Sequence, residues 1–303
     1  MSNYMRTILL LLLLLLLPAL PVAAEVRVFA CEPEWAALAG EIGGELVSAD
    51  SATTGLQDVH HIDARPSLIA RLRQSDLLVC TGAGLEAGWL PVLLRRANNP
   101  RVQPGKPGYL EASEYVRLLD RPERIDRAAG DVHAEGNPHI QLDPRNYLPV
   151  AEAMTDRLVQ IDPANAASYR EGLDDFRQRW QAALDRWNRE AEALQGMPIV
   201  VHHDAWVYLV DWLQLQQLAT LEPLPGVPPS SSHLSRLLQQ LEGSDAAAII
   251  HSSYQSPRAA NWLAEHTSLP VVELPATIGG TPAATDLFSL FDDITARLRT
   301  VAP

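Results

Sequence analysis

Three histidines stand in short polar motifs at points where a strand or loop gives way to a helix. The motifs read Asp58-Val59-His60-His61, Asn137-Pro138-His139 and His202-His203-Asp204. Imidazole nitrogen suits zinc, copper and nickel, and open α/β sheets bind ligands beyond the carboxyl ends of their strands. A single histidine is more often structural, but three such motifs in one chain predict a metal site where the imidazoles converge.

The elements that must position these motifs alternate between strand and helix. Apolar and β-branched runs predict strands at residues 26–31, 77–80, 199–201, 246–250 and 271–274, with helical patterns between them. Such alternation is typical of parallel sheets flanked by helices. The sequence therefore predicts an α/β fold.

One long helical pattern, from Pro163 to Leu194, separates the two halves of the chain. Its apolar residues recur every three or four positions, which predicts one buried stripe. At about 1.5 Å per residue the helix would be about 48 Å long, more than one small domain needs. We therefore predict two lobes, residues 25–162 and 196–303, each a parallel sheet flanked by helices, joined by a rigid helix over residues 163–195.

The first 24 residues have the pattern of a secretory signal: Arg6, an apolar run over residues 8–17, and Val22-Ala23-Ala24 at the end. The run is too short to span a bilayer, and no second stretch of about 18 apolar residues follows. We expect cleavage of residues 1–24, export to the periplasm and no membrane anchor. The formal net charge of −13 excludes a nucleic acid as partner.

The chain has two cysteines, Cys31 and Cys80, each at the end of a predicted strand. Neighbouring strands of a parallel sheet lie about 4.8 Å apart, within reach of a disulfide. An oxidising periplasm would allow the bridge to form. Two buried free thiols remain the alternative.

The segments around the three histidines resemble the metal-binding motifs of the zinc and manganese solute-binding proteins called cluster A-I. Residues 58–67 resemble the first motif, with Val59 where the family usually has proline, and residues 137–144 and 198–206 resemble the second and third. The likeness runs over most of the chain in the family's order. It implies a monomeric periplasmic protein that binds zinc as a transported ligand and delivers it to the permease of an ABC importer. A periplasmic metallochaperone is a further candidate partner.

Residue by residue, the resemblance implies that His60, His139 and His203 are the metal ligands. A nitrogen-rich site favours zinc over harder cations such as Mn²⁺. For the fourth position we favour Asp286, at the start of the last predicted helix, with Glu273 or a water molecule as alternatives.

Other polar residues lie within or beside the motifs. Adjacent side chains point in different directions, so we do not assign His61 and His202 as metal ligands. Asp58, Asp143 and Asp204 are each either an acceptor that fixes an imidazole or a helix cap.

Residues 128–136 stand where many zinc-binding members carry a long histidine-rich loop, and they include one histidine and two acids. The segment is either a weak capture or docking loop or an ordinary surface loop.

The main rival function is a zinc hydrolase that uses the same three histidines and an activated water, because catalytic zinc often has three protein ligands. The sequence has no His-Glu-x-x-His or Gly-x-Ser-x-Gly motif. We therefore predict a binding protein and no enzyme. A further alternative is a metal-dependent adhesin, which would have the same metal site but a different binding partner from the permease.

Overall fold

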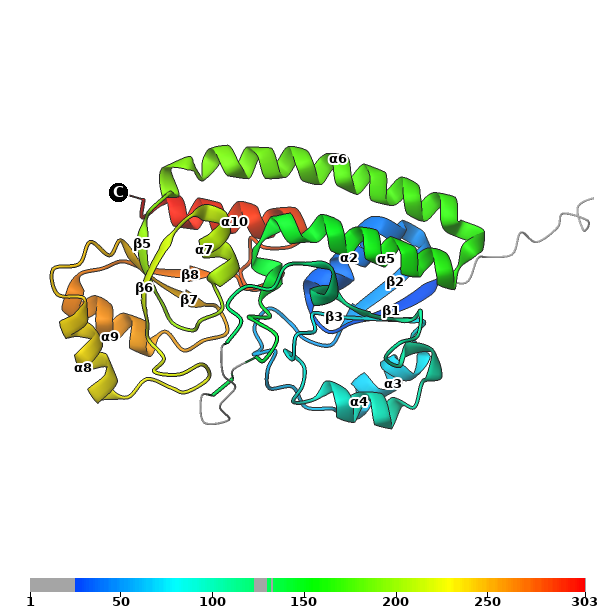
Figure 1. Ribbon diagram of the computed structural model, residues 1–303, viewed down its shortest axis with the longest axis horizontal. Helices are drawn as coiled ribbons and strands as arrows, with labels where there is room; N and C mark the ends of the chain where they lie inside the picture. Colours follow the sequence, from blue (N-terminus) through cyan, green and yellow to red (C-terminus); the bar gives the residue numbers. More distant parts are fainter. Residues whose placement is uncertain (1–24, 123–129, 132, 303) are drawn as a thin grey trace, which may run out of the picture.

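The computed structural model describes residues 25–122, 130–131 and 133–302. The predicted signal, residues 1–24, lies outside the described residues. Two four-stranded parallel sheets, each flanked by helices, form two lobes side by side (Figure 1). The predicted two-lobe α/β fold is confirmed. No helix in the described part of the chain is both long and apolar enough to cross a membrane.

The sheet of the first lobe has the order β2-β1-β3-β4. Its residues alternate between two cores, so that Val28 and Leu77 face α2 and α5 while Phe29 and Leu78 face α3 and α4. The elements of this lobe are β1 (Val26–Ala30), α2 (Pro33–Gly43), β2 (Val47–Ser51), α3 (Pro66–Gln74), β3 (Leu77–Cys80), α4 (Leu90–Ala97), β4 (Tyr109–Glu111) and α5 (Tyr147–Ile161).

The sheet of the second lobe has the order β6-β5-β7-β8. Val200 and Ile249 face α8 and α9, and Val201 and Ile250 belong to the core on the opposite face, with α7 and α10. The elements are β5 (Pro198–Val201), α7 (Val207–Leu213), β6 (Gln216–Thr220), α8 (Ser231–Gln240), β7 (Ala248–Ser252), α9 (Arg258–Thr267), β8 (Val271–Leu274) and α10 (Leu287–Arg299).

Short 3₁₀ helices fill several connections. They are η1 (Gly44–Leu46), η2 (Pro100–Val102), η3 (Ala112–Tyr115), η5 (Ile140–Leu142), η6 (Pro144–Asn146), η7 (Pro163–Asn165) and η8 (Glu192–Leu194). The last two flank the long helix that lies between the lobes in sequence.

That long helix is α6 (Ala166–Glu190), 25 residues and therefore about 37 Å long. It runs along the outside of both lobes (Figure 1) and packs against α2 and α5 of the first lobe and α10 of the second. Its buried residues form one stripe, as the spacing of apolar residues predicts: Tyr169, Leu173, Phe176, Trp180, Ala183 and Trp187. Because these residues belong to a core that includes side chains of both sheets, α6 binds the two lobes into one packed body.

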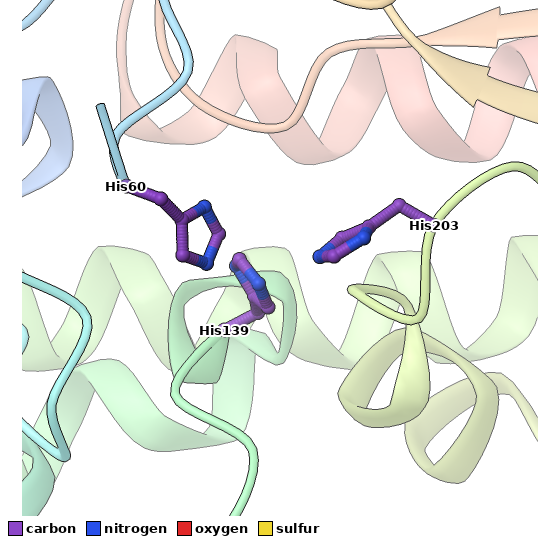
Figure 2. A group of neighbouring side chains, drawn as sticks. All are labelled: His60, His139 and His203. Carbon is purple, nitrogen blue, oxygen red and sulfur yellow. The ribbon is translucent and has the colours of Figure 1, made fainter. Parts of the chain in front are cut away.

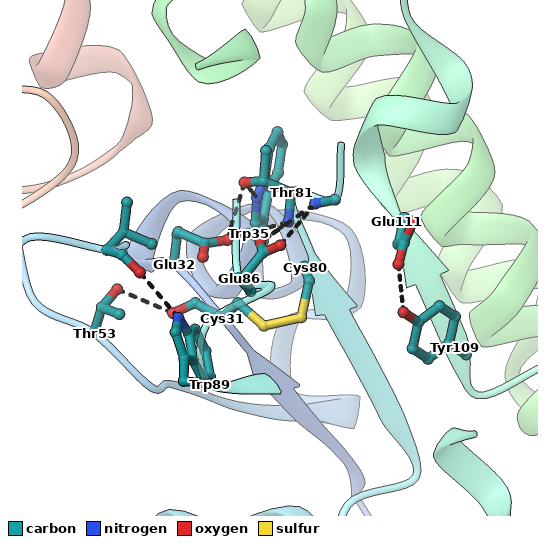
Figure 3. The surroundings of a disulfide bond; sticks show 12 residues. Cys31, Glu32, Trp35, Thr53, Cys80, Thr81, Glu86, Trp89, Tyr109 and Glu111 are labelled. Atoms are coloured by element: carbon teal, nitrogen blue, oxygen red, sulfur yellow. Dashed lines mark hydrogen bonds between the residues drawn. A yellow bond between two sulfur atoms is a disulfide. The ribbon is translucent and has the colours of Figure 1, made fainter. Parts of the chain in front are cut away.

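A disulfide joins the carboxyl ends of β1 and β3, as predicted (Figure 3). The two strands are neighbours, and the Cα atoms of Cys31 and Cys80 lie 4.7 Å apart. Both cysteines are fully buried. The next residue, Thr81, donates its backbone N–H to Glu86 at 2.8 Å and its hydroxyl to Glu32 at 3.0 Å. The bridge therefore fixes the carboxyl-terminal end of this sheet, where the segments that carry His60 and His139 leave the strands.

Candidate metal site

The three histidines of the sequence motifs come together between the lobes. Each offers a ring nitrogen, and these nitrogens all lie within 4.8 Å of one another. His60, His139 and His203 are 9%, 4% and 6% exposed, and Figure 2 shows their rings turned toward a common space. In a tetrahedral zinc site the ligand nitrogens are about 3.3 Å apart. A small closing movement would therefore bring these three to coordination distance.

His60 is held by the loop between β2 and α3. Asp58 accepts a hydrogen bond from the backbone N–H of His60 at 3.0 Å and pairs with its Nδ1 at 2.8 Å. Trp89 donates its indole N–H to the carbonyl of Val59 at 2.9 Å, which fixes the same loop. Burial raises the pKa of Asp58, but its hydrogen bonds to His60 outweigh this and hold the pKa below its usual value. Nε2 of His60 is buried without a hydrogen-bond partner among the described residues, so it is the atom available to a metal.

His203 follows β5 and is held by a residue that the sequence analysis missed. Its Nδ1 lies 2.7 Å from a carboxylate oxygen of Glu222, which also accepts the backbone N–H of Gly226 at 2.8 Å. Burial lowers the pKa of His203, but the hydrogen bond to Glu222 outweighs it and the pKa is raised. With Nδ1–H donated to the carboxylate, Nε2 is left to face the site.

His139 is positioned by the asparagine two residues before it. The side-chain oxygen of Asn137 accepts the backbone N–H of His139 at 3.0 Å, and its amide donates to the carbonyl of Asp204 at 2.7 Å. This pair of bonds ties the second motif to the third. Burial, followed by the nearby rings of His60 and His203, lowers the pKa of His139 well below its usual value. The imidazole is therefore neutral at pH 7, the form that binds a metal.

A fourth histidine lies against this group. The ring of His133 is 5.5 Å from the ring of His60, centroid to centroid. Burial is the largest cause that lowers its pKa, to about 4. His133 belongs to the segment 128–136, of which residues 128–129 and 132 lie outside the described residues. Its position favours the interpretation of that segment as a capture loop.

The structure does not bring the favoured fourth ligand to the histidines. Asp286 is the N-cap of α10, where its carboxylate accepts the backbone N–H of Ser289 at 2.8 Å in a reciprocal capping box. Asp286 and Glu273 are both exposed. Neither carboxylate belongs to the group formed by His60, His139 and His203. His61 and His202 do not belong to this group either. Asp286 and Glu273 are therefore left out of the ligand set proposed below.

Asp58, Asp143 and Asp204, each predicted to be either an imidazole acceptor or a helix cap, have different roles in the structure. Asp58 is an imidazole acceptor, as described above. Asp143 is a helix cap: it accepts the backbone N–H of Arg145 at 2.8 Å at the start of η6. Asp204 accepts the side-chain amide of Gln217 at 2.9 Å. Of the three, Asp58 is therefore the one whose carboxylate orients a converging imidazole.

Two α/β lobes that share a core and enclose converging imidazoles from both sides define a metal-binding protein of the two-lobed solute-binding class. Residues 28–301 match the family described as zinc-uptake complex component A, periplasmic. The chain belongs to this family, whose members are the substrate-binding components of metal transport systems.

Individual relatives are distant in sequence. The high-affinity zinc uptake system protein ZnuA of Yersinia pestis is 25% identical over 228 residues, which cover 69% of this chain and 70% of the relative. The protein of the same name from Paracoccus denitrificans (strain Pd 1222) is 25% identical over 279 residues, covering 79% and 80%. A crystal structure of ZnuA has a TM-score of 0.78 at 19% identity and covers 92% of this chain and 100% of that chain, which supports the fold.

Proposed function

We propose that this protein binds one zinc ion between its lobes and delivers it to the permease of an ABC importer. The convergence of three buried imidazoles carries the proposal, because two come from the first lobe and one from the second. A metal held from both sides links the lobes, so the loaded protein differs from the empty one in a way that a permease can recognise. The large shared core limits this change to a small closing movement.

The proposed ligands are His60, His139 and His203. Asp58 and Glu222 each accept a hydrogen bond from the ring nitrogen that would face away from the metal, which orients the imidazole and raises its basicity. Three neutral nitrogens favour zinc over manganese, magnesium and calcium. The fourth position is left to water or to another small ligand.

The same contacts argue against the hydrolase alternative. A zinc hydrolase needs a general base close to the metal-bound water. The carboxylates of Asp58 and Glu222 are instead hydrogen-bonded to imidazoles. We further propose that residues 1–24 direct the protein to the periplasm and are removed there, which agrees with the family's description.

Zinc titration of residues 25–303 against a competing chromophoric chelator tests this function. We expect one zinc per chain, bound much more tightly than manganese, and no zinc-dependent hydrolysis of generic ester or phosphate substrates. The absence of zinc binding would contradict the proposal. Zinc-dependent hydrolysis would favour the enzyme.

Glu222→Ala should lower zinc affinity by about 10 to 100-fold, because His203 loses the carboxylate that fixes its ring. Glu222→Gln should cost less, since the amide oxygen can still accept the hydrogen bond from Nδ1. The same competition titration measures both. Glu242→Ala, at an exposed position after α8, is the matched control and should bind zinc like the wild type. Unchanged affinity in Glu222→Ala would exclude this positioning role.

A further inference from the structure

A cavity of about 690 Å³ opens on one side of the histidine group. His60 and His203 line it, and His139 is not among its lining residues. A metal held by the three imidazoles would therefore turn its remaining coordination positions toward this cavity. Pockets of about 300–1,000 Å³ are typical of sites for small molecules. The space is far larger than one metal ion and a water molecule require.

The lining of the cavity includes a cation. Arg258, the first residue of α9, lines the cavity and forms no salt bridge among the described residues. Ser256 and Ala259 also line the cavity, so the amino-terminal end of this ten-residue helix borders it. The N-cap residue, Pro257, offers no side-chain hydrogen bond to the first turn. Free N–H groups and a guanidinium at one wall favour an anion there.

The three carboxylates in the lining, Asp58, Asp131 and Glu222, each lie close to a histidine ring. Asp58 and Glu222 are hydrogen-bonded to His60 and His203. The third, Asp131, has a carboxylate oxygen 3.8 Å from Nε2 of His61. Each carboxylate of the lining thus has a histidine partner, and the Arg258 guanidinium, which forms no salt bridge among the described residues, is available to an anion.

Apolar and aromatic groups also line the cavity. They include Pro228, Pro229, Leu234 and Trp262, and Tyr254 adds a ring with a polar end. A mostly apolar wall with a few polar groups at fixed positions is the usual composition of a site for a small organic ligand.

We propose that the cavity binds a small carboxylate-bearing chelator together with the zinc ion. The chelator fills the coordination positions that the three histidines leave free, and its carboxylate pairs with Arg258. The substrate is then a metal chelate of the amino-acid or polycarboxylate class. This inference rests on the proposed zinc-binding function and defines the form in which the metal is taken up.

Equilibrium dialysis with labelled L-histidine and labelled citrate tests the inference on zinc-loaded and zinc-free protein. We expect zinc-loaded protein to retain one molecule per chain of at least one of these probes, and zinc-free protein to retain neither. Arg258→Ala should weaken retention at least tenfold, because the carboxylate loses its partner. Its zinc affinity without a chelator should equal that of the wild type, since Arg258 is outside the ligand set.

Arg236→Ala is the matched control, because this exposed arginine of α8 does not line the cavity. It should retain the probe like the wild type. Zinc-loaded wild type that retains neither probe would overturn the inference and leave zinc binding intact. Equal retention by Arg258→Ala and wild type would also overturn it. Failure to bind zinc at all would instead reject the proposed function, and the inference with it.

Discussion

Alanine at His60, His139 or His203 should lower the zinc affinity of this protein more than 100-fold, which corresponds to at least about 2.8 kcal/mol. Each substitution removes one of the three converging nitrogens of the proposed ligand set. The loss should exceed the roughly 10 to 100-fold typical of a residue that only orients a ligand. Competition titration against a chromophoric chelator measures the effect, with circular dichroism to verify folding.

Two carboxylate variants are controls for this result. Asp286→Ala and Glu273→Ala should bind zinc like the wild type, because both residues are exposed and outside the histidine group. Asp286→Ala should instead lower the free energy of unfolding by about 1 kcal/mol through loss of the α10 cap. Near-normal zinc affinity in any of the three histidine variants would remove that residue from the ligand set. A large loss in Asp286→Ala would restore it as a fourth ligand.

Removal of the disulfide should lower the free energy of unfolding by about 4 kcal/mol on the chain-entropy model. The bridge joins cysteines 49 residues apart, so it restricts a long loop of the unfolded chain. In the double variant Cys31→Ala and Cys80→Ala, the midpoint of thermal unfolding should fall by roughly 10 °C. Alanine is chosen because both positions are fully buried and a serine would add an unsatisfied hydroxyl.

Reduced wild type provides the control for the cysteine variant. Dithiothreitol should produce the same loss of stability in the wild type and no further loss in the double variant. Thiol counting on denatured, unreduced wild type should find no free thiol. Two free thiols, or a midpoint that reduction leaves unchanged, would contradict the prediction.

The central strands were predictable because they are buried on both faces and therefore mostly apolar. The predicted strand at residues 77–80 has the same bounds as β3. One edge strand, β8, was also predicted with its observed bounds, because its sequence Val-Val-Glu-Leu is largely apolar. The other edge strands, β2, β4 and β6, were not predicted. Their sequences, such as Val47-Ser48-Ala49-Asp50-Ser51 in β2, carry polar residues and only partial burial. A polar edge strand of this kind owes its form to pairing with a neighbour, which local pattern does not reveal.

The sequence by itself determined which residues are the proposed ligands, because three histidines stand in motifs of polar and helix-starting residues. Only the tertiary structure decided which residues support them. Val201 and Thr220 are partners in the parallel register of β5 and β6, so His203 and Glu222, each two residues beyond, lie side by side although 19 residues separate them.

Asp286 shows the reverse case, in which a residue type suited to a metal does not lie at the site. Its carboxylate caps the amino-terminal end of α10 instead. The cavity that Arg258 borders is likewise a product of the fold, since its walls come from segments of both lobes. Residue types and short spacings fix which groups can bind a metal. The packing of two sheets and the register of their strands fix which of these groups meet.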